Sequence, residues 1–156
     1  MKKIDSIVSS GKCAGCMACH SVCPSKAIVI AEGSDGFLYP KIQPDMCVDC
    51  GVCFETCPIT AKRDDIHNSM CFAAQADDDT RFHSSSGGMF SVIAKYVLRQ
   101  GGVVCGAGFV DGKVRHCIVE TEEELDVLRK SKYIQSDSTG IYGKLQSFLR
   151  SGRRVL

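Results

Sequence analysis

The sequence predicts an α+β protein with two parts: a small cysteine-rich head and an incomplete α/β domain after it. Three observations carry this prediction. A cysteine motif occurs twice within the head, the pattern then changes to alternating helix-like and strand-like runs, and the last residues again resemble the start of a strand. We expect the head over residues 1–65 and the second domain over residues 70–156, with a boundary near residues 62–69.

The head is built on an internal repeat of the pattern C-x2-C-x2-C-x3-C-P. All four cysteines of the first copy recur 34 residues later, as does the proline that follows them, and such a constant offset indicates an internal repeat. In bacterial ferredoxins with this spacing, three cysteines of one run bind one iron–sulfur cubane and the fourth binds the other cluster. We therefore assign two [4Fe-4S] clusters, one to Cys13, Cys16, Cys19 and Cys57, and one to Cys47, Cys50, Cys53 and Cys23.

These motifs make the head similar to the two-cluster ferredoxin family over roughly residues 1–65. The resemblance implies a β-α-β fold with pseudo-twofold symmetry. The two copies differ where Met17 stands in place of Gly51. We expect the methionine to crowd the first ligand loop without preventing ligation.

Structural zinc is the main alternative, because paired C-x2-C motifs also form all-cysteine zinc sites. A structural zinc ion binds four thiolates, and zinc binding does not explain why a run of three cysteines, C-x2-C-x2-C, occurs twice. Disulfides are disfavoured because the chain has eleven cysteines and no secretory signal, so we expect a reducing, cytoplasmic location. We interpret His20 as a surface or supporting residue, since eight cysteines already fill the eight ligand positions.

Composition and charge narrow the function classes. Apolar residues make up 44% of the chain and charged residues 24%, as in ordinary globular proteins, and no apolar run has membrane-spanning length. Residues 1–66 hold seven Lys or Arg and eight Asp or Glu, and each bound cluster with its thiolates would add a charge of about −2. An acidic head favours a redox partner with a basic docking surface and argues against nucleic acid.

Local patterns predict the remaining elements in order. We expect a hairpin over residues 28–42, a strand over 70–76, a solvated loop over 77–79, an amphipathic helix over 89–100, a hairpin over 103–120, a helix from 121 to about 130, a helix over 139–150 and a strand from 153. We interpret Cys71, Cys105 and Cys117 as small buried hydrophobic residues, because they lack ligand spacing. A strand that starts at the last residues predicts that the chain is a fragment.

A Ser-Gly run stands before the helix expected at residues 89–100. The free N–H groups and the dipole of a helix start favour a bound phosphate. This makes Ser85, Ser86, Gly87 and Gly88 candidate contacts to a nucleotide or a flavin. Serine and glycine are also ordinary helix N-caps, so that interpretation stays open.

Three stretches of the second half, residues 84–91, 101–109 and 128–137, occur in the order seen in a known family. They resemble the N-terminal domain of the family of coenzyme F420 hydrogenase/dehydrogenase beta subunits over roughly residues 70–156. The resemblance implies FAD as a cofactor, coenzyme F420 as a two-electron carrier, and a partner that is part of a hydrogenase or dehydrogenase. It also implies that Lys132, Tyr133, Gln135 and Ser136 line the flavin pocket. The alternative is that Tyr133 and Ile134 are core residues and Lys132 lies on the surface.

The favoured function is an iron–sulfur electron-transfer component of an oxidoreductase, in which two clusters serve a flavin. The second hypothesis is a plain ferredoxin-type electron carrier whose second half only docks a redox partner. The third is a zinc-stabilised interaction module. The sequence shows no acid–base pair or nucleophile motif, so we assign no catalytic residues.

Overall fold

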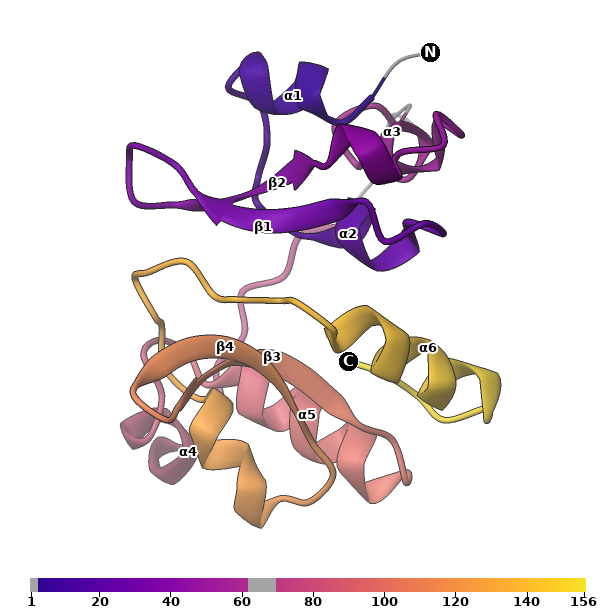
Figure 1. Cartoon of the computed structure of the whole chain (residues 1–156). Coiled ribbons are helices and arrows are strands. Elements are labelled where there is room, and N and C mark those ends of the chain that lie inside the picture. The colour runs from indigo at the N-terminus through magenta and orange to yellow at the C-terminus, as the bar shows by residue number, and fades with distance from the viewer. Residues whose placement is uncertain (1–2, 62–69) are drawn as a thin grey trace. The chain divides into compact units, whose positions relative to one another are not determined.

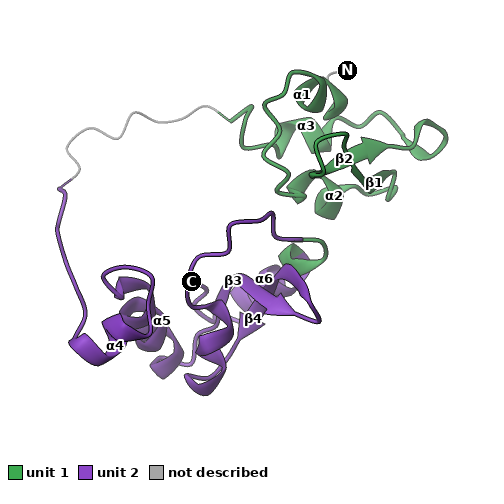
Figure 2. Cartoon of the chain, turned by 90° about the vertical axis from the view of Figure 1, so that its left-hand side faces the viewer, with its two compact units in different colours: residues 1–66, 138–142 green, residues 67–137, 143–156 purple. Residues whose placement is uncertain are grey.

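The computed structural model describes residues 3–61 and 70–156, and the chain divides into two compact units (Figures 1 and 2). Unit 1 comprises residues 1–66 and 138–142, and unit 2 comprises residues 67–137 and 143–156. The boundary expected near residues 62–69 lies outside the described residues. Residues 138–142 belong to unit 1 although they follow most of unit 2 in the sequence. A single boundary along the chain does not predict this assignment.

Unit 1 is built around a two-stranded antiparallel hairpin with short helices. Strand β1 (Ile28–Glu32) pairs with β2 (Leu38–Ile42), and Ile28 lies opposite Ile42, which confirms the hairpin expected over residues 28–42. The helical elements are α1 (Asp5–Ser9), α2 (Ala18–Val22), the 3₁₀ turn η1 (Pro44–Met46) and α3 (Val52–Glu55). Helices α2 and α3 each begin two residues after the second cysteine of a repeat copy, so the repeat in the sequence is also a repeat of backbone structure.

Unit 2 is built around a second antiparallel hairpin. Strand β3 (Val104–Val110) pairs with β4 (Lys113–Val119). The connecting Asp111 and Gly112 both have positive φ angles, of 50° and 73°, as the tight hairpin turn requires. Helix α5 (Met89–Arg99) and the 3₁₀-helix η2 (Glu123–Leu128) pack on this ribbon. The buried core of unit 2 consists of Ala94, Leu98, Val104, Val119, Leu125 and Leu128.

Helix α6 (Ile141–Arg150) is followed by an isolated β-bridge at Val155 in place of the strand expected from residue 153. Val155 forms a parallel bridge with Val103, and Val103 N donates to the Arg154 carbonyl at 2.8 Å. The hairpin of unit 2 therefore gains a parallel neighbour at the edge formed by β3. None of the described helices is long and apolar enough to cross a membrane.

Three expectations for the second half are wrong in detail. Residues 70–76 form no strand, and Met70 and Phe72 are 80% and 81% exposed. The acidic run is not a loop, because the Asp77 side chain accepts a hydrogen bond from Thr80 N and caps helix α4 (Asp78–Phe82). The capping box forms as predicted between Thr121 and Glu124, yet the turns it opens are 3₁₀ and end at Leu128.

Candidate cluster and cofactor sites

One cavity of unit 1 is lined by four cysteines that come from both copies of the repeat. Its cysteines are Cys13, Cys16, Cys19 and Cys57, and apolar residues such as Ile4 complete the lining. Three of these cysteines belong to the first ligand loop, and the fourth comes from the end of the second copy. This is the set that the spacing predicts for the first cluster.

A second cavity of unit 1 has the reciprocal lining. Its cysteines are Cys23, Cys47, Cys50 and Cys53, and Lys3, Ala27 and Ile42 also contribute. The fourth cysteine is thus exchanged between the two copies in the arrangement of the side chains. Ligation by these eight residues stays a prediction, but the structure brings together both sets that the prediction needs.

The two cavities border the hydrophobic core of unit 1. Cys19 and Cys57 are buried among Ile4, Ile28 and Ile42. Burial raises the pKa of the Cys19 thiol to about 12. In such an apolar site the thiol is neutral when no metal is bound. Metal binding would release its proton, because the thiolate is the form that acts as a ligand.

Hydrogen bonds to sulfur are present in both sets of cysteines, each on a residue of the first repeat copy. Gly15 N donates to Cys13 Sγ at 3.5 Å, and Ala27 N donates to Cys23 Sγ at 3.3 Å. Burial alone would raise the pKa of Cys23, but hydrogen bonds with the Ser25 side chain and the backbone outweigh it and lower that pKa. Donors of this kind stabilise thiolates and are one determinant of the reduction potential of a cluster.

The cysteines of each cavity are spread around it and are not gathered at one point. Within residues 3–61 and 70–156, no three Cys, His, Asp or Glu side chains converge closely enough to hold one metal ion. Zinc needs four ligands at about 2.0–2.3 Å from a single centre, whereas a cubane spreads its thiolates around a larger core. His20 is half-buried, and its Nδ1 has no hydrogen-bond partner among the described residues.

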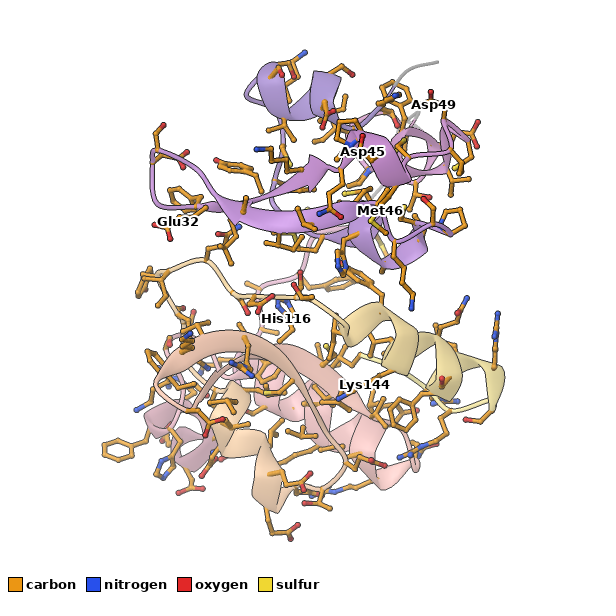
Figure 3. All side chains as sticks on the ribbon, viewed as in Figure 1. Glu32, Asp45, Met46, Asp49, His116 and Lys144 are labelled. Atoms are coloured by element: carbon orange, nitrogen blue, oxygen red, sulfur yellow. The ribbon has the colours of Figure 1, made fainter. Side chains whose placement is uncertain are left out.

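An ion pair that the sequence did not reveal secures the second ligand loop. Asp49, in the loop before α3 (Figure 3), pairs with Lys3 and accepts a hydrogen bond from Cys47 Sγ at 3.5 Å. The hydrogen bond from Lys3 is the main cause of the lowered pKa of Asp49. The beginning of the described chain is thereby tied to the loop that presents Cys47 and Cys50.

Unit 2 contains a separate cavity of about 410 Å³ at the N-terminus of α5. Residues 84–91 and 128–131 line it, together with Ala74. All four predicted contacts of the Ser-Gly run, Ser85, Ser86, Gly87 and Gly88, are in this lining. The volume lies within the range of small-molecule binding sites.

The polar groups of this cavity suit an anion. Gly88 occupies the N-cap of α5 with a φ angle of 79° and offers no side chain to the first N–H groups of the helix. Two polar atoms of the lining residues, Ser91 Oγ and Arg129 Nε, are buried and have no hydrogen-bond partner in the described part of the chain. Ser91 is only 1% exposed. A buried donor without a partner is costly, and an anionic ligand would satisfy both groups.

Sequence reasoning did not single out Ser91 and Arg129, although both lie in stretches that carry the family resemblance. Their positions in the chain could have indicated them, because Ser91 is the third residue of α5 and Arg129 directly follows η2. Arg129 also pairs through Nη1 with Asp126 at 2.9 Å. The ion pair restrains the guanidinium of Arg129, which lines the same cavity as the Ser-Gly run.

The remaining predicted flavin contacts do not line this cavity. Lys132 Nζ instead donates to the carbonyls of Val127 at 3.0 Å and Arg129 at 2.6 Å, and burial lowers the pKa of Lys132. Tyr133 is 93% exposed. Ser136 Oγ lies 2.9 Å from Nδ1 of His116 on β4 (Figure 3). Gln135 is half-buried outside the lining.

The alternative interpretation of this segment also needs correction. Tyr133 and Ile134 are not core residues, since both are exposed. Of the three cysteines expected to be buried, Cys105 and Cys117 are half-buried in the β3–β4 ribbon, whereas Cys71 is exposed. All eleven cysteines are free thiols.

The paired cysteine cavities are of the kind expected in a ferredoxin-type iron–sulfur domain, and the comparison with known families agrees for this part of the chain. Residues 12–61 match the 4Fe-4S dicluster domain. Residues 70–141 match the N-terminal domain of the coenzyme F420 hydrogenase/dehydrogenase beta subunit. The chain therefore joins a 4Fe-4S dicluster domain to this beta-subunit domain, which makes it an electron-transfer component related to proteins of F420-dependent dehydrogenases and reductases.

Two curated relatives align with both halves of the chain. One is a subunit of the F(420)H(2) dehydrogenase of Methanosarcina mazei, which is 26% identical over 144 residues that cover 84% of this chain and 41% of the relative. The other is the coenzyme F420-dependent sulfite reductase of Methanocaldococcus jannaschii, which is 27% identical over 146 residues, or 84% of this chain and 21% of the relative.

A third relative aligns over a shorter stretch. It is a subunit of the Na(+)-translocating ferredoxin:NAD(+) oxidoreductase complex of Acetobacterium woodii, and it is 41% identical over 61 residues that cover 35% of this chain and 17% of the relative. The chain thus spans less than half the length of each of these three relatives.

Proposed function

We propose that the chain carries two [4Fe-4S] clusters and an FAD, and that it passes electrons between a redox partner and a two-electron carrier such as coenzyme F420. Each cluster takes up one electron, and a flavin accepts electrons singly from clusters and exchanges them as a hydride with a second carrier. The order of a dicluster domain followed by a beta-subunit domain supports this assignment. The domains would extend over residues 1–65 and 70–156.

The eight repeat cysteines would hold the clusters. Their distribution over two cavities, with Cys57 beside Cys13 and Cys23 beside Cys47, supports the exchange of the fourth ligand. The apolar surroundings of Cys19 and Cys57 would keep water away from the first cluster, whereas Cys50 leaves the second cluster more exposed. The N–H donors at Cys13 and Cys23 would favour the reduced form of each cluster, because they stabilise added negative charge on sulfur.

The cavity of unit 2 would hold the phosphate end of the flavin. The observation that carries this assignment is the pair of unsatisfied donors, Ser91 Oγ and Arg129 Nε, beside the open N-terminus of α5. The residues present fit a diphosphate, since helix N–H groups, hydroxyls and a guanidinium all donate to its oxygens. When bound, the flavin would supply the step between one-electron and two-electron chemistry.

The partner we propose is a redox protein, such as a component of a hydrogenase or dehydrogenase, with a basic surface that matches the acidic head. Asp45, Asp49 and Glu55 are exposed near the second ligand loop and would contribute to that contact. Eleven free thiols suit a reducing compartment, so we place the protein in the cytoplasm.

Cofactor content of the anaerobically purified chain tests the proposal. Iron, acid-labile sulfide and flavin are measured on one sample, before and after incubation with FAD or FMN. We expect about eight irons, as two cubanes require, together with one flavin. Full iron without flavin would contradict the oxidoreductase assignment and leave a plain ferredoxin-type carrier with a docking domain.

A further inference from the structure

The two ligand loops make the same backbone turn with different residues. Met17 and Gly51 occupy equivalent positions of the repeat, and both have left-handed backbone conformations, with φ angles of 59° and 77°. Glycine adopts this conformation freely, whereas a residue with a Cβ is strained in it. The first loop therefore needs an additional interaction to keep the turn that the second loop obtains from glycine.

That interaction comes from a segment far along the chain. Ser138 Oγ and Tyr142 Oη both donate hydrogen bonds to the backbone carbonyl of Cys16, at 2.9 Å and 2.7 Å. Ser138 and Tyr142 belong to unit 1 together with the loop they contact. Ser138 is 5% exposed and Met17 is 2% exposed, so the bonds lie in a site where competition from water is weak.

The contacted carbonyl controls the direction of a neighbouring donor. The peptide bond between Cys16 and Met17 is planar and trans, so the carbonyl oxygen and the Met17 N–H point in opposite directions. Two hydroxyls that hold the carbonyl on one side therefore fix the N–H on the other side. This N–H lies between the second and third cysteines of the loop, where backbone donors to sulfur influence the potential of a cluster.

We propose that Ser138 and Tyr142 are positioning residues for the cluster bound by Cys13, Cys16, Cys19 and Cys57. They act through the Cys16–Met17 peptide and tune the potential of this cluster without acting on the other. The inference rests on the proposed clusters and is independent of the flavin.

The test uses Tyr142→Phe, Ser138→Ala and the double variant of the full chain, each loaded with iron and sulfide under anaerobic conditions. A redox titration followed by electron paramagnetic resonance (EPR) resolves the two clusters. We expect the midpoint potential of one cluster to become more negative, because its N–H donor is less well held, while the other potential stays constant. Cys50→Ala removes a ligand of the second cluster and identifies which signal belongs to it. Tyr96→Phe on α5, where Tyr96 is 57% exposed, is the matched control.

Met17→Gly provides a rescue experiment. Loss of Tyr142 Oη is expected to raise the rate of iron loss to a chelator on the order of threefold to tenfold, as removal of one hydrogen bond implies. In the Met17→Gly background the increase should be much smaller, since glycine keeps the turn without help. If Tyr142→Phe loses a cluster altogether, restoration by Met17→Gly supports the inference and a failure to restore contradicts it.

Unchanged potentials of both clusters in the fully loaded double variant would overturn the inference. This outcome is distinct from failure of the proposed function, which the flavin content of the wild-type chain decides. A wild-type chain without flavin that still shows the selective shift would retain the positioning role and lose the oxidoreductase assignment.

Discussion

The backbone N–H of Ser131 donates a hydrogen bond to Ser85 Oγ at 3.0 Å. The two residues are 46 positions apart, and both line the cavity at the start of α5. The bond joins the Ser-Gly run to the turn that carries Arg129, so two stretches that were separate in the sequence form one site. An anion held there would contact both sides at once.

Ser91→Ala tests whether the unpaired hydroxyl serves a ligand. We expect FAD to bind roughly fivefold more weakly, as loss of about 1 kcal/mol of hydrogen bonding implies. Stability without flavin should stay the same or rise, because Ser91 Oγ is buried without a partner among the described residues. Flavin fluorescence and thermal unfolding measure the two effects. Ser147→Ala on the exposed side of α6 is the control, and an unchanged flavin affinity in Ser91→Ala would remove Ser91 from the site.

Paired cysteine substitutions test the exchange of the fourth ligand. Cys57→Ala combined with Cys13→Ala should remove one cluster and leave about four irons, because both residues serve the same cubane. Cys57→Ala combined with Cys47→Ala should remove both clusters. Cys71→Ala is the control, since Cys71 is exposed and outside both cavities. If the first pair loses nearly all iron and the second pair keeps about half, the assignment of the ligands is reversed.

Two glycines give opposite predictions for stability. A Cβ at Gly102 would lie 2.5 Å from Val97 Cγ1 and 2.9 Å from the carbonyl oxygens of Val97 and Arg154. Gly102→Ala should therefore lower the free energy of unfolding by about 1–3 kcal/mol. Gly143 lies in α6 with no atom within 4 Å of such a Cβ, so Gly143→Ala should raise it by about 0.5–1 kcal/mol. Denaturant unfolding under reducing conditions compares them, and equal effects would contradict the packing around Gly102.

The cap of α4 predicts a pH dependence. Hydrogen bonds from Thr80 lower the pKa of Asp77 below its ordinary value of 3.8, and Thr80 and Ser84 connect α4 to the Ser-Gly run. A lowered pKa in the folded state stabilises α4 above pH 3.8, and this stabilisation is lost as the pH falls through the folded pKa. Asp77→Ala should thus reduce hydrogen-exchange protection of α4 at about pH 7, and the difference from wild type should vanish in strong acid.

Asp77→Asn and Asp78→Ala are controls for the cap. Asparagine also caps helices well, so Asp77→Asn should keep the protection of α4 with little dependence on pH. Asp78 is exposed and pairs only with Arg81 among the described residues, so its removal should have a small effect. Equal loss of protection in Asp77→Ala and Asp78→Ala would show that the negative charge of the run, and not the cap, protects α4 from hydrogen exchange.

The head was predictable because ligand spacing fixes its geometry. The exchange of Cys23 and Cys57 between copies, and the hairpin that follows Ala27, both follow from the repeat and from local turn chemistry. The hydrogen bonds to the Cys16 carbonyl were not predictable from the head alone, since their donors are Ser138 and Tyr142. Contacts between residues so far apart in the chain leave no local pattern.

The elements of the second half were predictable where the apolar pattern is strongly periodic. The prediction was wrong where a run of charged residues was interpreted as a loop. Helix α5 and the β3–β4 hairpin follow their apolar patterns and turn residues. The run Asp77–Asp79 looked like a solvated loop, although Asp is also a preferred N-cap residue and Asp77 accepts a hydrogen bond from Thr80 N. Tyr133 is 93% exposed, which contradicts the expectation of a core residue, whereas its contact to a flavin stays a prediction.

Counting the electrons that the chain accepts tests the central claim most directly. In an anaerobic reductive titration of the FAD-treated chain, visible absorption follows the flavin and EPR follows the clusters. Two cubanes and one flavin should take up about four electrons per chain, one for each cluster and two for the flavin. Uptake of about two electrons, with both cluster signals present and no flavin bleaching, would contradict the claim that the clusters serve a flavin in this chain.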